Sequence, residues 1–303
     1  MVRADGRRAA LVTVCCVLLA GCGSSAPTAA PTPVTPPAEA PPVSLPAPPV
    51  IAITGRITDT VTGQSIGTFT QAVSTLPAAV TVSAPGYVRR ETWVTTASPT
   101  VDLFPERGFD LPFYRELVRN AHEGTLQPLW VLPAAPAFYM EVEGRKGLSR
   151  QMATQLEAVA RRLVPLLTGG RMQVTRWETG PDPRPRQQGW IMIERRDEPD
   201  ACGRAYVGAP DGLIWLNGDS RLCDRLEAVF AHELGHAFGL WHTSRPGTMM
   251  YGATDWWRLS SADGPNDLER HHAALAYARR RGNTDVDVDP AGVASVADQL
   301  VVD

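Results

Sequence analysis

The chain has 303 residues, of which 29 are basic and 32 acidic, so its formal net charge is −3. A charge so close to neutral provides no basic surface for nucleic acid, and nucleic acid is therefore excluded as a partner. The chain contains only six histidines and five cysteines, so a cluster of either type is informative.

Residues 1–21 have the form of a secretory signal peptide. Three arginines precede an apolar run over residues 9–20, which is too short for a membrane-spanning helix of about 20 residues. The ending Leu19-Ala20-Gly21-Cys22 resembles the bacterial lipobox, which implies cleavage before Cys22 and lipid attachment to its thiol. The alternative is an ordinary cleaved signal followed by a chance cysteine. We therefore expect an exported lipoprotein, anchored in a membrane and facing the periplasm or the cell surface.

The remaining cysteines predict one disulfide. Cys15 and Cys16 leave with the signal peptide and Cys22 takes the lipid, which leaves Cys202 and Cys223 of the five. A single pair in an exported protein is expected to be oxidised. The alternative is a free thiol that blocks a metal.

Residues 22–49 are dominated by Pro, Ala and Thr, a composition that favours an extended polyproline II tether. Over residues 50–105, apolar and polar residues alternate with a period of two between turn signals, which predicts a small antiparallel β-sandwich. The segments Thr54–Asp59, Thr62-Gly63 and Ala84–Tyr87 resemble the carboxypeptidase regulatory-like family of transthyretin-like folds. That resemblance implies a non-catalytic module, and a generic β-sandwich of another family is the alternative.

Residues 106–124 are interpreted as a connection that is partly helical around residues 113–121. An orderly α/β series follows over residues 125–282, with one helix capped by Ser149. Residues 283–303 form an acidic tail that we expect to be disordered. The predicted strands are residues 137–143, 172–177, 190–194, 204–207 and 212–217, and the later helices are residues 221–238 and 265–281.

The stretch 232–242, HELGHAFGLWH, contains three of the six histidines. His232 and His236 are four residues apart, so on a helix both imidazoles project from one face and can bind one metal. His242 can reach the same metal only if the chain leaves the helix sharply, and Gly239 permits the positive φ that this requires. Three neutral imidazoles leave zinc one open position, which is typical of a catalytic site rather than a structural one. Glu233, beside the first ligand, is then the expected general base.

With these residues the chain resembles the metzincin zinc metalloproteases, and it is closest in texture to the matrixin-like members because of Gly235 and Gly239-Leu240. The resemblance spans residues 125–282. It implies an α/β fold: a twisted, mostly parallel sheet with an antiparallel edge strand, an active-site helix and a C-terminal helix, preceded here by the small all-β sandwich. It also implies one catalytic Zn²⁺ and a peptide or protein substrate bound in extended conformation.

The family's Met-turn is matched by residues 248–252, TMMYG. Met250 fits the matrixin-like pattern, whereas Met249 followed by Tyr251 would fit the astacin-like pattern, in which the tyrosine approaches the metal or the transition state. We prefer Met250, with Tyr251 as a wall or packing residue. A matrixin-like latency cysteine is absent between Cys22 and Cys202, and no calcium loop is recognisable, so a structural Ca²⁺ is left open.

These features predict an exported, lipid-anchored zinc endopeptidase that hydrolyses peptide bonds with Glu233 as general base. The alternative is a non-proteolytic surface-binding lipoprotein that uses a metzincin fold and the β-sandwich for adhesion or scaffolding. All three ligands and the glutamate are present, which favours the enzyme. The oligomeric state, the substrate and the cleavage specificity do not follow from the sequence.

Overall fold

The computed structural model describes residues 49–144, 147–197, 201–217, 223, 225–252 and 264–291. The predicted signal peptide, the lipid-bearing Cys22 and nearly all of the tether lie outside these residues, so they stay predictions. In the part of the chain that is described, no helix is both long and apolar enough to span a membrane.

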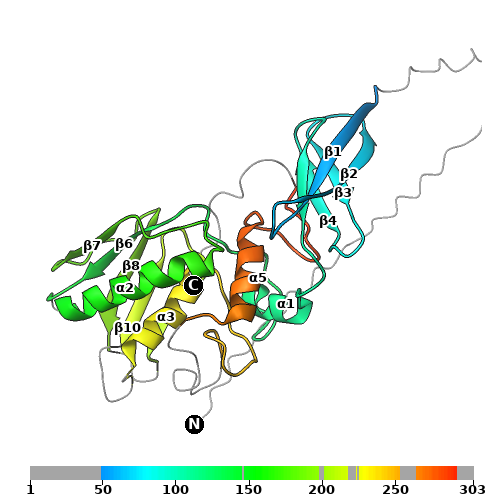
Figure 1. Ribbon diagram of the computed structural model, residues 1–303. Helices are drawn as coiled ribbons and strands as arrows, with labels where there is room; N and C mark the ends of the chain where they lie inside the picture. Colours follow the sequence, from blue (N-terminus) through cyan, green and yellow to red (C-terminus); the bar gives the residue numbers. More distant parts are fainter. Residues whose placement is uncertain are drawn as a thin grey trace, which may run out of the picture. The chain divides into compact units, whose positions relative to one another are not determined.

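The N-terminal β module consists of two small sheets that share one hydrophobic core (Figure 1). Ile53 and Leu103, both fully buried, contribute to this core from the first sheet, and Val80 and Val82 contribute from the second. The first sheet is not purely antiparallel as predicted, because its first and last strands pair in parallel. The three-stranded sheet has the order β2-β1-β5 and the second sheet pairs β3 with β4; the strands are β1 Ile51–Asp59, β2 Ser65–Val73, β3 Ala78–Val82, β4 Arg90–Val94 and β5 Thr100–Leu103.

The predicted connection contains helix α1, Leu111–Arg119, which begins two residues earlier than predicted. The Asp110 side chain caps this helix by accepting a hydrogen bond from the Phe113 N–H. Phe113 and Leu117 are buried in the main core cluster, the one that also contains the sheet and the motif helix. The segment is therefore an integral part of the α/β domain rather than a linker.

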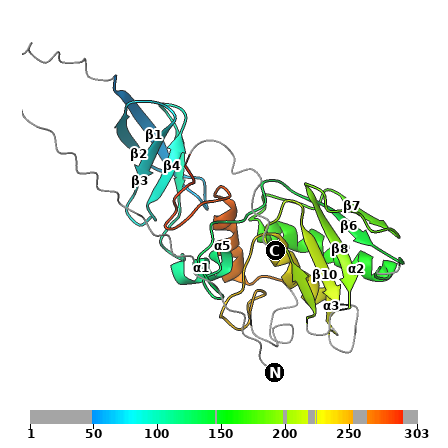
Figure 2. The same ribbon diagram turned by 180° about the vertical axis from the view of Figure 1, so that it is seen from behind.

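The α/β domain contains a five-stranded sheet with the order β7-β6-β8-β10-β9. Its pairs are parallel except for β10 with β9, which is antiparallel and lies at the edge. This confirms the predicted mostly parallel sheet with an antiparallel edge strand. Helices α2 and α3 lie against one face of the sheet (Figure 1, and from behind in Figure 2). The strands are β6 Ala137–Glu141, β7 Trp177–Gly180, β8 Trp190–Arg196, β9 Gly203–Ala205 and β10 Leu213–Asn217, and the helices are α2 Arg150–Leu167, α3 Leu226–Ala237 and α5 Asp267–Tyr277.

Two predicted elements are displaced. The strand expected at residues 172–177 begins only at Trp177, because Met172 and Val174 bury their side chains in the main core without joining the sheet. The motif helix begins at Leu226 rather than near residue 221. Ser149 caps α2 as predicted, by accepting a hydrogen bond from the Met152 N–H.

Cys202 and Cys223 form the predicted disulfide. Cys202 immediately precedes β9, and Cys223 lies three residues before α3. The bond therefore ties the edge strand to the approach of the motif helix.

The acidic segment after α5 corrects the prediction of a disordered tail from residue 283. Residues 283–291 are described, and the side chains of Asp287 and Asp289 are only 1% and 0% exposed. The Glu91 N–H donates to the Asp287 carbonyl, and the Asp289 N–H donates to the Glu91 carbonyl, so the segment extends the edge of β4. Arg279 pairs with Asp287 at 2.6 Å and Arg90 with Asp289 at 2.9 Å. Arg90, which is distant in sequence, and Arg279, just after the end of α5, thus neutralise two carboxylates of the segment that was predicted to be disordered.

Candidate metal centre

Helix α3 brings His232, Glu233 and His236 into the interior of the domain. Every residue of α3 from Ala228 to Ala237 is buried, so the helix is enclosed and the two histidines do not belong to a solvated face. Their four-residue spacing places both imidazoles on one side of the helix, as predicted.

The end of α3 explains how the third histidine reaches the other two. Gly239 has φ +88°, and its N–H donates to the His236 carbonyl at 2.8 Å. The Leu240 N–H donates back to the Gly235 carbonyl at 3.0 Å. This pair of bonds is the Schellman motif, which ends a helix on a left-handed residue and turns the chain. A side chain at position 239 would also meet the Trp130 carbonyl oxygen at 2.9 Å. Glycine is therefore required at position 239 both by the positive φ and by the close approach of the Trp130 carbonyl. The turn that follows places His242 beside the face of α3 that carries the other two histidines.

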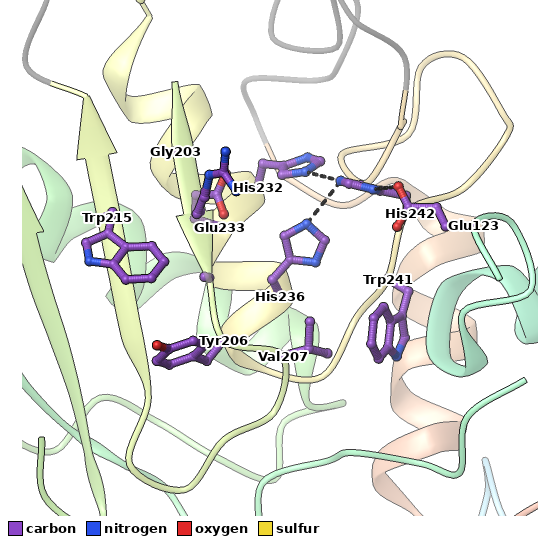
Figure 3. Close-up of a pocket in the computed structure, with 12 residues that line it drawn as sticks. Glu123, Gly203, Tyr206, Val207, Trp215, His232, Glu233, His236, Trp241 and His242 are labelled. Atoms are coloured by element: carbon purple, nitrogen blue, oxygen red, sulfur yellow. Dashed lines mark hydrogen bonds and ion pairs between the residues drawn. The ribbon is translucent and has the colours of Figure 1, made fainter. Parts of the chain in front are cut away.

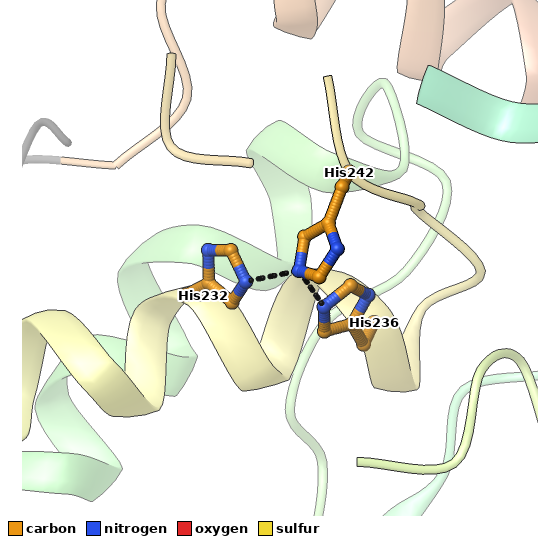
Figure 4. Close-up of side chains that lie close together, drawn as sticks. All are labelled: His232, His236 and His242. Atoms are coloured by element: carbon orange, nitrogen blue, oxygen red, sulfur yellow. Dashed lines mark hydrogen bonds between the residues drawn. The ribbon is translucent and has the colours of Figure 1, made fainter. Parts of the chain in front are cut away.

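The three imidazoles converge on one point (Figure 4). The Nε2 atom of His242 lies 3.1 Å from Nε2 of His232 and 3.1 Å from Nε2 of His236. One ring nitrogen from each residue lies within 4.8 Å of the other two, so among the described residues these three side chains form a group that could hold a metal ion. In tetrahedral zinc sites, bond lengths of about 2.0–2.1 Å place the ligand nitrogens about 3.3 Å apart.

The hydrogen-bond partners of the three Nδ1 atoms, which point away from the point of convergence, determine the tautomer of each histidine. Nδ1 of His232 lies 2.8 Å from the Met249 carbonyl, and Nδ1 of His236 lies 2.7 Å from the Leu240 carbonyl. Nδ1 of His242 contacts the Glu123 carboxylate. These partners only accept, so each Nδ1 carries the hydrogen and each neutral ring has a bare lone pair on Nε2. The close Nε2 contacts are then not hydrogen bonds, and three lone pairs directed at one point fit a cation between them. The residues present therefore fit zinc.

The electrostatics of the site favour the neutral ligands that a metal needs. Burial, together with the neighbouring imidazoles of His236 and His242, holds the pKa of His232 well below its usual range. Burial and the His242 ring lower the pKa of His236 to about 3. Both residues therefore bear lone pairs at neutral pH.

Glu233 lies beside these ligands in a cavity of about 480 Å³ (Figure 3). Its side chain is buried, and its Oε2 atom has no hydrogen-bond partner among the described residues. Burial raises the pKa of Glu233 to about 8, and the charge of Arg204 acts in the opposite direction. A cation held by the three histidines would likewise lower this pKa. The walls of the cavity are formed by β9, the chain that follows it, and Glu123, Trp215, Trp241 and the motif residues.

Residues 183–267 match the sequence profile of the Matrixin family. This part of the chain is similar to the matrixins. Among solved structures, metalloproteinase-II from Bacteroides fragilis aligns over 75% of this chain and 86% of its own length, with 13% sequence identity and a TM-score of 0.32. The comparison with curated proteins finds no match. The matrixin match, together with the histidine geometry, supports a metzincin-like metalloprotease domain.

The predicted Met-turn of this matrixin-like region lies beneath α3. Met249 and Met250 are both buried, and the sulfur of Met250 would lie only 2.4 Å from a Cβ added to Gly235. The Met249 carbonyl is the one that orients His232. Tyr251 is half-buried and bridges to Thr243 in the loop after the third ligand. The assignment of Met250, rather than Met249, as the Met-turn residue stays a prediction.

Three residues that contribute to the site were not predicted from the sequence. Gly203 packs against Glu233, Glu123 contacts His242, and Glu269 on α5 accepts hydrogen bonds from the Met249 and Met250 N–H groups, each at 2.9 Å. Only Glu269 has a sequence signal, because Asn266 and Glu269 form a capping box. Glu123 lies in the segment that we interpreted as a connection, and nothing local distinguishes it.

Proposed function

We propose that the protein is an exported, lipid-anchored zinc endopeptidase. One observation carries the catalytic part of this proposal. Three Nε2 lone pairs converge beside Glu233, with Nε2 of His242 lying 3.1 Å from each of the other two, and Glu233 is a buried carboxylate with an oxygen that no described residue satisfies. Three nitrogen ligands, an adjacent acid or base and a wide cavity are the components of zinc-dependent hydrolysis.

His232, His236 and His242 would hold the zinc ion. When bound, zinc supplies Lewis acidity, which makes water more acidic and a substrate carbonyl more electrophilic. Glu233 removes a proton from the attacking water and then delivers it to the amine of the leaving peptide. The burial of Glu233 supports this role as a base, because burial raises the pKa of the carboxyl group, so that its ionised form takes up a proton more readily than a carboxylate at an ordinary surface position.

An extended peptide is the proposed substrate. Strand β9 lies at the edge of the sheet and borders the cavity, so a peptide that adds to its outer edge would pass in front of Glu233. Tyr206 and Val207, which follow β9, and Trp241 add apolar surface along that path (Figure 3). Large apolar side chains of a substrate would find contacts there.

Export and anchoring rest on the sequence of residues 1–22. The disulfide Cys202–Cys223 agrees with an oxidising compartment. Mass spectrometry of membrane-extracted protein tests this part, because a lipid on Cys22 predicts a diacylglyceryl-modified N-terminal peptide. An unmodified soluble chain would refute the anchor without affecting the peptidase proposal.

The catalytic proposal is tested by incubating the zinc-loaded protein with a diverse peptide library and reading the products by mass spectrometry. Glu233→Gln keeps the volume of the buried side chain and removes the base, so we expect it to bind zinc but abolish cleavage. Glu227→Ala is the matched control, because Glu227 is exposed on the same helix. Cleavage by Glu233→Gln at the wild-type rate would refute the role of Glu233. A folded, zinc-loaded wild type that cleaves nothing would favour a binding function instead.

A further inference from the structure

The loop that carries the third ligand, residues 241–245, is held by the segment Asp110–Glu123. The Trp241 N–H donates to the Leu117 carbonyl at 2.6 Å. The Ser244 N–H and hydroxyl both donate to the Glu116 carboxylate, the former at 2.9 Å. Arg245 pairs with Asp110. This segment lies outside residues 183–267, which match the matrixins, and precedes the domain boundary expected from the sequence.

Within this segment, Glu123 has a different kind of contact from its neighbours. Its carboxylate accepts the Nδ1–H of His242 itself, across 119 residues of sequence. The other two ligands use backbone carbonyls of their own motif region, those of Met249 and Leu240. Among the contacts of the described residues, His242 is therefore the ligand whose Nδ1 partner is a carboxylate rather than a backbone carbonyl (Figure 3).

The exposure of His242 makes this contact consequential. The His242 side chain is 25% exposed, whereas His232 and His236 are enclosed by α3 and its surroundings. A partly exposed imidazole can rotate away from the other two unless a second partner holds its outer nitrogen. A carboxylate at that position also increases the basicity of the ligating nitrogen, and such outer partners contribute strongly to metal affinity.

We infer that Glu123 is a positioning residue for the metal: its carboxylate holds His242 in the Nδ1–H tautomer and in the orientation that completes the three-histidine site. This inference rests on the proposed function only in taking a metal ion to be the occupant of that site. It assigns Glu123 no contact with the substrate or with the metal. It also means that the functional domain begins at α1, so a domain cut at residue 125 would lack a component of the site.

The test is the zinc affinity of the full-length chain, measured by competition with a chromophoric chelator. Glu123→Gln retains an acceptor oxygen but removes the charge, and we expect it to weaken zinc binding by about 10- to 100-fold, the usual effect of losing such an outer partner. Glu116→Gln is the matched control, because that carboxylate holds the same loop through Ser244 and contacts no ligand. Its zinc affinity is expected to stay close to that of the wild type.

A second readout separates positioning from general stability. In the cobalt-substituted protein, the visible absorption bands report the ligand field, so we expect them to shift in Glu123→Gln and to stay unchanged in Glu116→Gln. The melting temperature of the metal-free protein should differ little between Glu123→Gln and the wild type, because Glu123 is 45% exposed.

Unchanged zinc affinity and an unchanged cobalt spectrum in Glu123→Gln would overturn the inference. An equal loss of affinity in both variants would also overturn it, because the loop as a whole, rather than the carboxylate, would then be responsible. A wild-type chain that binds zinc without cleaving peptides would refute the proposed peptidase alone, since the affinity difference between the variants would still be measured.

Discussion

Gly203 on β9 lies directly against Glu233 on α3. A Cβ built on Gly203 would stand 2.7 Å from Cγ of Glu233 and 2.8 Å from Cγ1 of Val229. Both neighbours belong to the buried part of α3, so an added methyl group must displace either the edge strand or the glutamate. The edge strand and the proposed general base are therefore packed too closely for any other residue at position 203.

We expect Gly203→Ala to lower kcat for peptide cleavage by up to about 100-fold, since a displacement of about 1 Å in a catalytic group has an effect of this size. Zinc content should stay at one ion per chain, because the atoms nearest to the added Cβ belong to Glu233 and Val229 rather than to a histidine ligand. Gly67→Ala on β2 is the control, since the nearest atom to an added Cβ is 3.9 Å away. The measurements are steady-state kinetics for kcat and metal analysis for the zinc content of the two variants. An unchanged kcat in Gly203→Ala would show that the added methyl group does not displace Glu233.

Glu269 stabilises the turn beneath the metal site. Its carboxylate is fully buried and accepts the N–H groups of Met249, Met250 and Asn266, each at 2.9 Å. Glu269→Gln places an amide NH₂ against backbone donors, so we expect a loss of about 2 kcal/mol in the free energy of unfolding. Urea denaturation measures this loss. Glu157→Gln, which breaks only an exposed pair with Arg161 on α2, should cost less than about 0.5 kcal/mol. Equal effects of the two changes would contradict the role of Glu269.

Asp289 joins the C-terminal segment to the β module. Its carboxylate is 0% exposed, pairs with Arg90 at 2.9 Å and accepts the Thr92 hydroxyl. Asp289→Ala leaves part of the Arg90 charge buried without its counter-charge. We therefore expect the free energy of unfolding to fall by about 3 kcal/mol. The control is Asp267→Ala, because the Asp267 side chain is 91% exposed and pairs only at the surface with Arg270. This change should lower the free energy of unfolding by less than about 1 kcal/mol. Thermal unfolding compares the stability of the two variants. If Asp289→Ala were as stable as the wild type, the other ion pair of Arg90, with Asp102, would be enough to neutralise the buried guanidinium.

His272 predicts a loss of stability in mild acid. It is fully buried, its Nδ1 lies 2.8 Å from the Leu268 carbonyl, and its Nε2 accepts the Asp110 N–H at 2.9 Å. Burial lowers the pKa of His272 to about 4; the hydrogen bond to the Leu268 carbonyl and the charge of Asp110 oppose this shift, whereas His271 and Arg245 add to it. The neutral form is thus favoured by folding. The stability that this preference adds is complete above pH 6.5, the pKa of the histidine in the unfolded chain. It is lost as the pH falls from 6.5 to about 4, the pKa in the folded protein.

The expected loss over that interval is about 3 kcal/mol, from roughly 1.4 kcal/mol per pKa unit. The measurement is urea unfolding at a series of pH values in the presence of a chelator, for the wild type and for His272→Gln. Because the other titrating groups are shared, the difference between the two curves isolates His272. Parallel curves between pH 6.5 and 4 would refute this account.

Local sequence determined the parts of the site that lie within one turn of chain. The spacing of His232 and His236, the glycine at 239 and the third histidine at 242 are read directly from residues 232–242, because a helix and its terminating turn have fixed geometry. Ser149 as a cap and Cys202–Cys223 as a disulfide were likewise predicted, from cap chemistry and from cysteine arithmetic. The parallel sheet with its antiparallel edge followed from the family resemblance.

Tertiary structure alone decided which distant side chains complete the site. Glu123 meets His242 across 119 residues, and Asp289 meets Arg90 across 199. A carboxylate on a short segment has no local feature that reveals its partner, so Glu123 was assigned to a connection and Asp289 to a disordered tail. Whether such a charge is exposed or buried depends on the counter-charge or donor that folding brings to it, and this depends on the path of the whole chain.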